Sequence, residues 1–147
     1  MPATRVVLFV IALSLAACSK PVPEAGPDEL AREYLYLELS MALHDEAHVD
    51  AYFGPEALRS AAEDTSLTLD QLLAWSQDLA SKLEGSDTSC DPRLAMRRDG
   101  LLARLQALET RVAINKGESP AFDVESVALF AARAPPSEAA QFQELLD

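Results

Sequence analysis

LTLDQLLAWSQDLASKLEG, residues 67–85, is the stretch that decides the fold class, because it contains both ends of one helix and an apolar face between them. Thr68 is placed to cap the amino end, and Gln71, three residues later, is its capping-box partner. Gly85 is suited to a left-handed cap at the carboxyl end. The predicted buried face consists of Leu72, Trp75, Leu79 and Leu83.

A second helix is predicted upstream, from Pro27 or Asp28 to about His44. One apolar stripe along it is formed by Leu30, Tyr34, Leu37 and Met41. A second stripe, roughly 140° away at 100° per residue, is formed by Leu35, Leu39 and Ala42. A helix with two apolar faces needs neighbours on both sides. The second face is therefore a candidate surface for a protein partner or for a missing downstream domain.

Four further helices complete the prediction, and no alternating apolar and polar segment indicates a strand. They cover about residues 55–64, 91–115, 123–133 and 137–146, each beginning at a proline or an N-cap residue. We therefore expect an all-α fold of about six helices, a single irregular bundle over residues 28–147.

The amino terminus has the pattern of an export signal. Val6–Ala17, VVLFVIALSLAA, is an apolar run after a short segment with one cation. It is too short to cross a bilayer, which takes roughly 20 apolar residues. Leu15-Ala16-Ala17-Cys18 resembles the bacterial lipobox, which implies cleavage before Cys18 and attachment of lipid to that residue.

Cleavage there makes residues 1–17 a signal peptide, and the alternative is an ordinary secreted protein cut near Ala17. Residues 18–27, rich in proline, then form a flexible tether that holds the domain at the membrane. By resemblance to sorting in Gram-negative lipoproteins, Ser19 after the cysteine favours the outer membrane, with the domain in the periplasm.

The composition narrows the possible partners. The formal net charge of −12 argues against nucleic acid and against electrostatic attraction to anionic lipid. Arg97, Arg104 and Arg111, seven apart, could form an anion-binding ridge. In so acidic a chain, ion pairs with neighbours such as Glu33 or Glu38 are the favoured interpretation.

Two groups of residues are candidate chemical sites. His44 and His48, four apart on the predicted helix, could face one metal ion with Asp45 completing the shell. The competing interpretation is a favourable interaction of the histidines with the helix carboxyl end. Cys90 has acidic neighbours that raise a thiol pKa, so a spare surface thiol is expected rather than a nucleophile. We expect no catalytic residue and no cofactor.

Two segments resemble a known group of proteins. The first comprises residues 33–39, 44–45 and 49–56, and the second comprises residues 105–111, 122–126 and 128–130. Together they resemble the N-terminal helical region of uncharacterised bacterial proteins with a zinc-peptidase-like (gluzincin-type) domain further on. The resemblance implies that the metal-binding helix lies beyond Asp147, so no family ligand is carried over. In that family the position of His48 is usually aromatic.

These expectations combine into one functional hypothesis: a membrane-anchored periplasmic lipoprotein whose helical accessory or interaction domain has no catalysis of its own. Two alternatives stay open. One is the N-terminal fragment of a larger metallopeptidase-like enzyme, which agrees with a chain whose predicted last helix runs to its final residues. The other is a structural envelope lipoprotein that self-associates through its first helix.

Overall fold

The computed structural model describes residues 26–133, 135–136 and 142–143, and these residues form five helices without a strand. The helices are α1 (Pro27–Met41), α2 (Glu56–Thr65), α3 (Leu69–Glu84), α4 (Pro92–Asn115) and α5 (Phe122–Phe130). The predicted all-α class is confirmed. The predicted helix at 137–146 lies almost wholly outside the described residues, as do the predicted signal peptide and most of the predicted tether.

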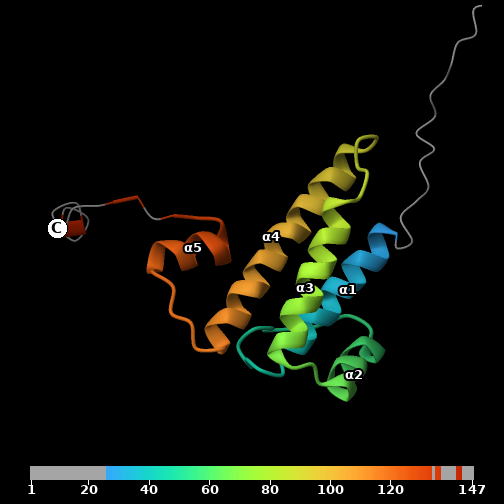
Figure 1. Ribbon diagram of the computed structural model, residues 1–147, viewed down its shortest axis with the longest axis horizontal. Helices are drawn as coiled ribbons and strands as arrows, with labels where there is room; N and C mark the ends of the chain where they lie inside the picture. The colour runs from blue at the N-terminus through green and yellow to red at the C-terminus, as the bar shows by residue number, and fades with distance from the viewer. Residues whose placement is uncertain (1–25, 134, 137–141, 144–147) are drawn as a thin grey trace, which may run out of the picture.

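Three helices form the body of the fold. α1, α3 and α4 run side by side, α2 packs beside α1, and α5 packs against α4 on the side away from α3 (Figure 1). No helix within the described ranges has the length and apolar character needed to cross a membrane.

The core forms where the apolar stripes of the three long helices meet. Its fully buried side chains include Leu37, Met41, Leu72, Leu79, Leu105, Leu108 and Val112. The predicted faces of α1 and α3 therefore point inward, although Tyr34 and Trp75 are only partly buried at the edge. Removal of this apolar surface from water is the main force that holds the bundle together.

The predicted helix starts are confirmed in α3 and α4. Thr68 Oγ1 accepts a hydrogen bond from the Gln71 amide at 3.3 Å, and Gln71 Oε1 accepts one from the Thr68 amide at 2.9 Å. At α4, the Asp91 carboxylate accepts from the Arg93 amide at 2.8 Å. Both side chains satisfy amides that have no partner within their helix.

The prediction of a left-handed Gly85 is wrong. Gly85 has a φ of −72°, because the chain continues the right-handed turn: its amide bonds the Ser81 carbonyl at 3.0 Å. Ser86 then binds the Leu83 carbonyl through both its amide and its hydroxyl. The carbonyls at the end of α3 are thus satisfied without a left-handed residue.

α5 begins and ends earlier than predicted. Its N-cap is Ala121, with no side-chain cap, and Asp123 lies within the first turn instead of capping the helix. The helix ends at Phe130 because Ala131 adopts a left-handed conformation with a φ of 51°. The Ser126 hydroxyl donates to the Ala132 carbonyl at 2.7 Å and holds the returning chain against the helix.

The second apolar face of α1 is partly covered within the chain. Leu39 is 7% exposed and Ala62 of α2 is 1% exposed, and both lie outside the main core cluster, where α1 packs against α2. Ala42 is half-buried, whereas Leu35 is exposed. α2 is therefore one of the neighbours that the two-faced pattern of α1 requires.

Candidate functional site

The structure separates the two histidines of the predicted metal site. α1 ends at Met41, and the amides of His44 and Asp45 both bond the Met41 carbonyl in a turn. His44 and His48 therefore do not share a helix face, and the premise of the metal-site prediction is wrong. Within the described ranges, no group of three or more His, Cys, Asp or Glu residues is arranged to hold a metal ion.

Each histidine has its own partner. His44 Nε2 lies 2.6 Å from the Leu67 carbonyl oxygen, and His48 Nε2 lies 2.5 Å from Glu38 Oε2. A carbonyl oxygen and a carboxylate can only accept, so both nitrogens carry a proton and donate it. A proton on Nε2 leaves the lone pair of a neutral imidazole on the other ring nitrogen, Nδ1. The His48 contact joins the turn after α1 to α1, and the His44 contact joins that turn to the loop before α3.

Glu38 is the centre of a small polar cluster on α1. Besides His48, it accepts a hydrogen bond from the Tyr34 hydroxyl one turn earlier, and burial together with this carboxylate raises the pKa of Tyr34. Tyr34 therefore keeps its proton at neutral pH. The cluster links α1 to the turn that follows it.

The three arginines of α4 do not form an anion-binding ridge. Arg97 pairs with Asp28 at 2.7 Å, and Arg111 lies 4.0 Å from Asp45. Arg104 donates to the Gly100 carbonyl of its own helix at 3.1 Å. The expectation of acidic partners is correct for two of them, but the partners are not Glu33 or Glu38.

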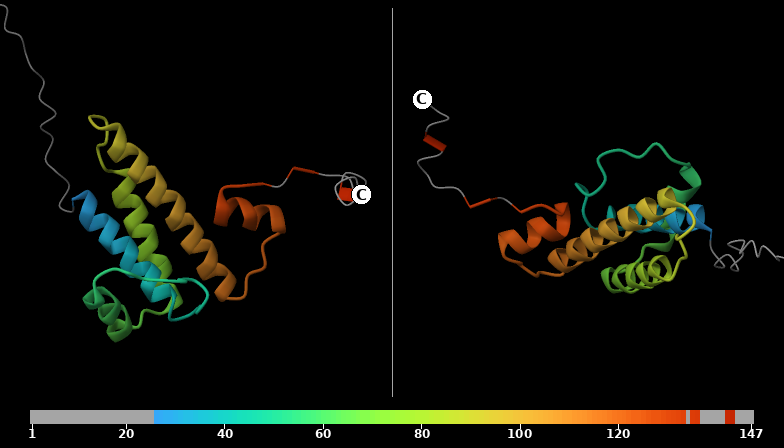
Figure 2. Two further views of the ribbon diagram at one scale, coloured as in Figure 1. Left: turned by 180° about the vertical axis from the view of Figure 1, so that it is seen from behind. Right: turned by 90° about the horizontal axis from the view of Figure 1, so that it is seen from above.

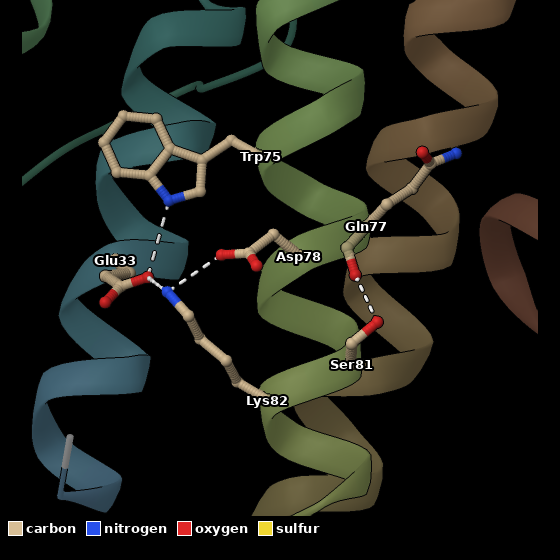
Figure 3. A network of polar contacts seen from close by, with 6 residues as sticks. All are labelled: Glu33, Trp75, Gln77, Asp78, Ser81 and Lys82. Atoms are coloured by element: carbon tan, nitrogen blue, oxygen red, sulfur yellow. Dashed lines mark hydrogen bonds and ion pairs between the residues drawn. The ribbon is translucent and has the colours of Figure 1, made fainter. Parts of the chain in front are cut away.

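A shallow groove of about 580 Å³ runs between α1 and α3. Its lining combines apolar and charged side chains: Glu33, Leu67, Gln71, Ala74, Trp75, Asp78 and Lys82. Figure 3 shows Lys82 of α3 reaching between Glu33 of α1 and Asp78 of α3, with Nζ–O distances of 3.3 and 2.9 Å. The Trp75 indole donates to the same Glu33 oxygen at 3.4 Å.

The charges in this groove already satisfy one another. The hydrogen bond to Asp78 is the main cause that raises the pKa of Lys82, so its amine stays protonated and is no nucleophile. Glu33 is engaged by two donors. The Trp75 ring packs on Tyr36 with centroids 5.1 Å apart. The groove is best explained as a seam that joins α1 to α3.

One half-buried carboxyl group, that of Glu109, has a shifted pKa. Burial raises the pKa of Glu109 on α4 above its ordinary value of 4.5, and the hydrogen bond from Ser76 opposes the rise. Ser76 Oγ lies 3.2 Å from Glu109 Oε1 and 2.9 Å from the Leu73 carbonyl. A serine beside a carboxylate can suggest a nucleophile and its base. Ser76 is 0% exposed, however, so no substrate reaches it, and the pair joins α3 to α4.

Cys90 lies in the loop between α3 and α4 and is exposed. Its Sγ lies 3.8 Å from the Ser89 hydroxyl. The expectation of a spare thiol is wrong, because none of the described cysteines is free. The only other cysteine in the sequence is Cys18, which is outside the described residues.

The largest departure from an ordinary solvated surface is on α5. None of its residues is buried, and Phe122, Val124, Val127 and Phe130 are 72%, 58%, 41% and 71% exposed. We name these four side chains the α5 apolar surface. Large apolar side chains that remain exposed together on one helix are candidates for contact with a partner. The sequence signal for this surface is the high apolar content of FDVESVALF, residues 122–130. One helix face cannot bury all of these apolar side chains.

No family model matches the chain, and no curated protein or solved structure matches it.

Proposed function

We propose that this chain is a lipid-anchored protein of the bacterial cell envelope whose helical domain is an accessory or interaction module without catalysis of its own. The export signal and the lipobox-like residues before Cys18 support the anchor. The mature chain would keep 130 of the 147 residues after removal of the first 17. By the Ser19 argument, it lies on the periplasmic side of the outer membrane.

The single observation that carries the interaction role is the α5 apolar surface. Phe122 and Phe130 expose most of their ring area at the two ends of a helix that touches only α4 among the described helices. Exposing large aromatic side chains to water costs free energy that a partner would recover. The polar clusters described above join helices to one another, so none of them competes as a reaction site. Leu35 on α1 is a second, smaller exposed contact for a partner.

The test of the anchor is the intact mass of the tag-free protein purified from membranes, compared with a Cys18→Ala variant. We expect the mass of residues 18–147 plus lipid, and loss of the lipid and of membrane association in the variant. One sulfur cannot form both a disulfide and a lipid thioether, so the same spectrum shows which bond Cys18 makes. An unlipidated product, or a disulfide at Cys18, refutes the anchor.

The resemblance to zinc-peptidase-like proteins favours a second candidate, the N-terminal part of a larger metallopeptidase-like enzyme. In that case the α5 apolar surface and Leu35 would contact the downstream domain. The intact-mass measurement also separates this candidate: a mass well above that of residues 18–147 plus lipid supports the enzyme. The matching short mass supports the stand-alone module.

A further inference from the structure

The exposed side of α5 has one continuous apolar stripe. Glu125, Ser126, Ala128 and Leu129 are half-buried, whereas Val124, Val127 and Phe130 are exposed. At 100° per residue, the three exposed side chains lie within about 120° of one another around the helix. α5 contacts only α4 among the described helices, and in Figure 2 it lies at the edge of the bundle. The stripe therefore points away from the domain.

We propose that this stripe binds a second copy of the chain, with the two α5 helices packed antiparallel about a twofold axis at Val127. The symmetry places Val127 against Val127 of the second copy and Phe130 against Val124 of the second copy. A twofold contact of this kind uses the same patch on both copies. Each large aromatic ring then lies over a smaller branched side chain, which is a complementary fit.

Charge decides the direction of packing. Asp123 and Glu125 lie in the first turn of α5, and Arg133 follows its last turn. Arg133 is exposed and forms no ion pair with the part of the chain that the structure describes. An antiparallel pair brings Asp123 of each copy near Arg133 of the other, whereas a parallel pair places acid beside acid. Opposed helix dipoles favour the same direction.

The same charges disfavour a lipid surface as the occupant of the stripe. Asp123 and Glu125 lie on α5 beside the stripe, so anionic headgroups repel this side of the domain. A second copy offers both the apolar surface and a cation at the matching position.

The contact is small. A helix of nine residues is about 14 Å long, less than a standard interface of about 800 Å² per partner requires. The dimer should therefore be weak in free solution and populated when both copies are held on one membrane, where the effective concentration is high. This last step rests on the lipid anchor of the proposed function.

Disulfide cross-linking in membranes tests the geometry. The full chain is expressed with its own signal and with Cys90→Ser, and Val127→Cys is added as the reporter. Mild oxidation should give a band of twice the monomer mass. Val124→Cys alone should give little of it, whereas Val124→Cys with Phe130→Cys should give it again. Met96→Cys, at an exposed site on α4, measures random collision.

Charge exchange tests the direction. Asp123→Arg or Arg133→Asp should each lower the Val127→Cys cross-link, and the two together should restore it. Phe130→Asp should lower it by about tenfold or more, because the aromatic contact with Val124 of the second copy is lost. Since Phe130 is exposed, circular dichroism should show that this variant folds. Rescue by the double exchange is a result that a merely local effect on α5 would not produce.

Several outcomes overturn the inference. A Val127→Cys cross-link no stronger than that of Met96→Cys, in protein that stays in the membrane fraction, refutes the dimer but leaves the anchor intact. Protein absent from the membrane fraction refutes the anchor instead. Binding of the Cys18→Ala form to vesicles of phosphatidylethanolamine and phosphatidylglycerol, abolished by Phe130→Asp, would assign the stripe to lipid.

Discussion

His48 Nε2 lies 2.5 Å from Glu38 Oε2, and this contact fastens the turn after α1 to the helix that precedes it. The side chains are 10% and 18% exposed, so water screens the interaction only partly. His44, four residues earlier, makes a separate contact with the Leu67 carbonyl oxygen.

His48→Ala should destabilise the domain by about 1–3 kcal/mol, because it removes one of the two side-chain donors of a poorly solvated carboxylate. Urea unfolding followed by circular dichroism measures the change. Glu38→Gln and the double variant complete a cycle, and the two single effects should not add. Glu46→Ala, an exposed change in the same turn, is the control and should lie within about 0.5 kcal/mol of wild type.

Zinc at micromolar concentration should leave the melting temperature of the domain unchanged. Among the residues that the structure describes, no group of three or more His, Cys, Asp or Glu side chains is arranged to hold a metal ion. Thermal unfolding with zinc and with a chelator makes the comparison. A zinc-dependent rise in melting temperature that disappears in both His44→Ala and His48→Ala would restore the metal site.

Leu105→Ala should cost about 2–5 kcal/mol of unfolding free energy, since Leu105 is 0% exposed where α4 meets the core. Met96→Ala on the same helix, at a side chain 77% exposed, is the matched control and should change stability by less than about 0.5 kcal/mol. Equal effects of the two changes would mean that α4 does not pack with the face described here.

Thr68→Ala should lower stability by about 1 kcal/mol, because it removes the acceptor of the α3 capping box. Thr65→Ala deletes another exposed threonine hydroxyl, which only bonds the Ala61 carbonyl one turn back in α2. Chemical denaturation of both variants should give a clearly smaller loss for Thr65. If the order were reversed, the cap would not be what defines the start of α3.

Glu109→Gln should raise stability at neutral pH. Burial raises the pKa of Glu109, so the folded state holds this proton more tightly than the unfolded state does. Stability from this group is therefore fully present below the ordinary pKa of 4.5 and is lost as pH rises through the folded value. Glutamine stays uncharged and avoids that loss.

The advantage of Glu109→Gln over wild type should accordingly shrink toward zero as pH falls through 4.5. Denaturant unfolding at a series of pH values measures the difference. Glu84→Gln, an exposed change on α3, is the matched control for altered net charge. A difference that does not vary with pH would assign the effect to side-chain shape instead of charge.

Most helix positions were predictable because their causes are local. The capping box at Thr68 and the Asp91-Pro92 start each depend on residues within a few positions of one another. Predictions were less accurate at carboxyl ends. Gly85 can adopt a left-handed conformation but is not forced to, and the bonds to Ser81 and Leu83 decide the outcome.

The candidate sites were predicted less well, because their partners are distant in the sequence. Arg97 pairs with Asp28, 69 residues earlier, and Ser76 meets Glu109, 33 residues later. Spacing along one helix shows which side chains share a face, but it does not show which face of another helix lies opposite.

By itself, the sequence determined that this chain is all-α, where its long helices begin and which faces of them are apolar. These properties follow from hydrogen bonds and side-chain periodicity within single segments. Only the tertiary structure decided that His44 and His48 have separate partners, that α2 covers part of α1, and that α5 keeps Phe130 in water. Those outcomes depend on contacts between helices that are distant in the sequence. The packing of the whole chain determines which apolar surfaces are covered and which stay exposed.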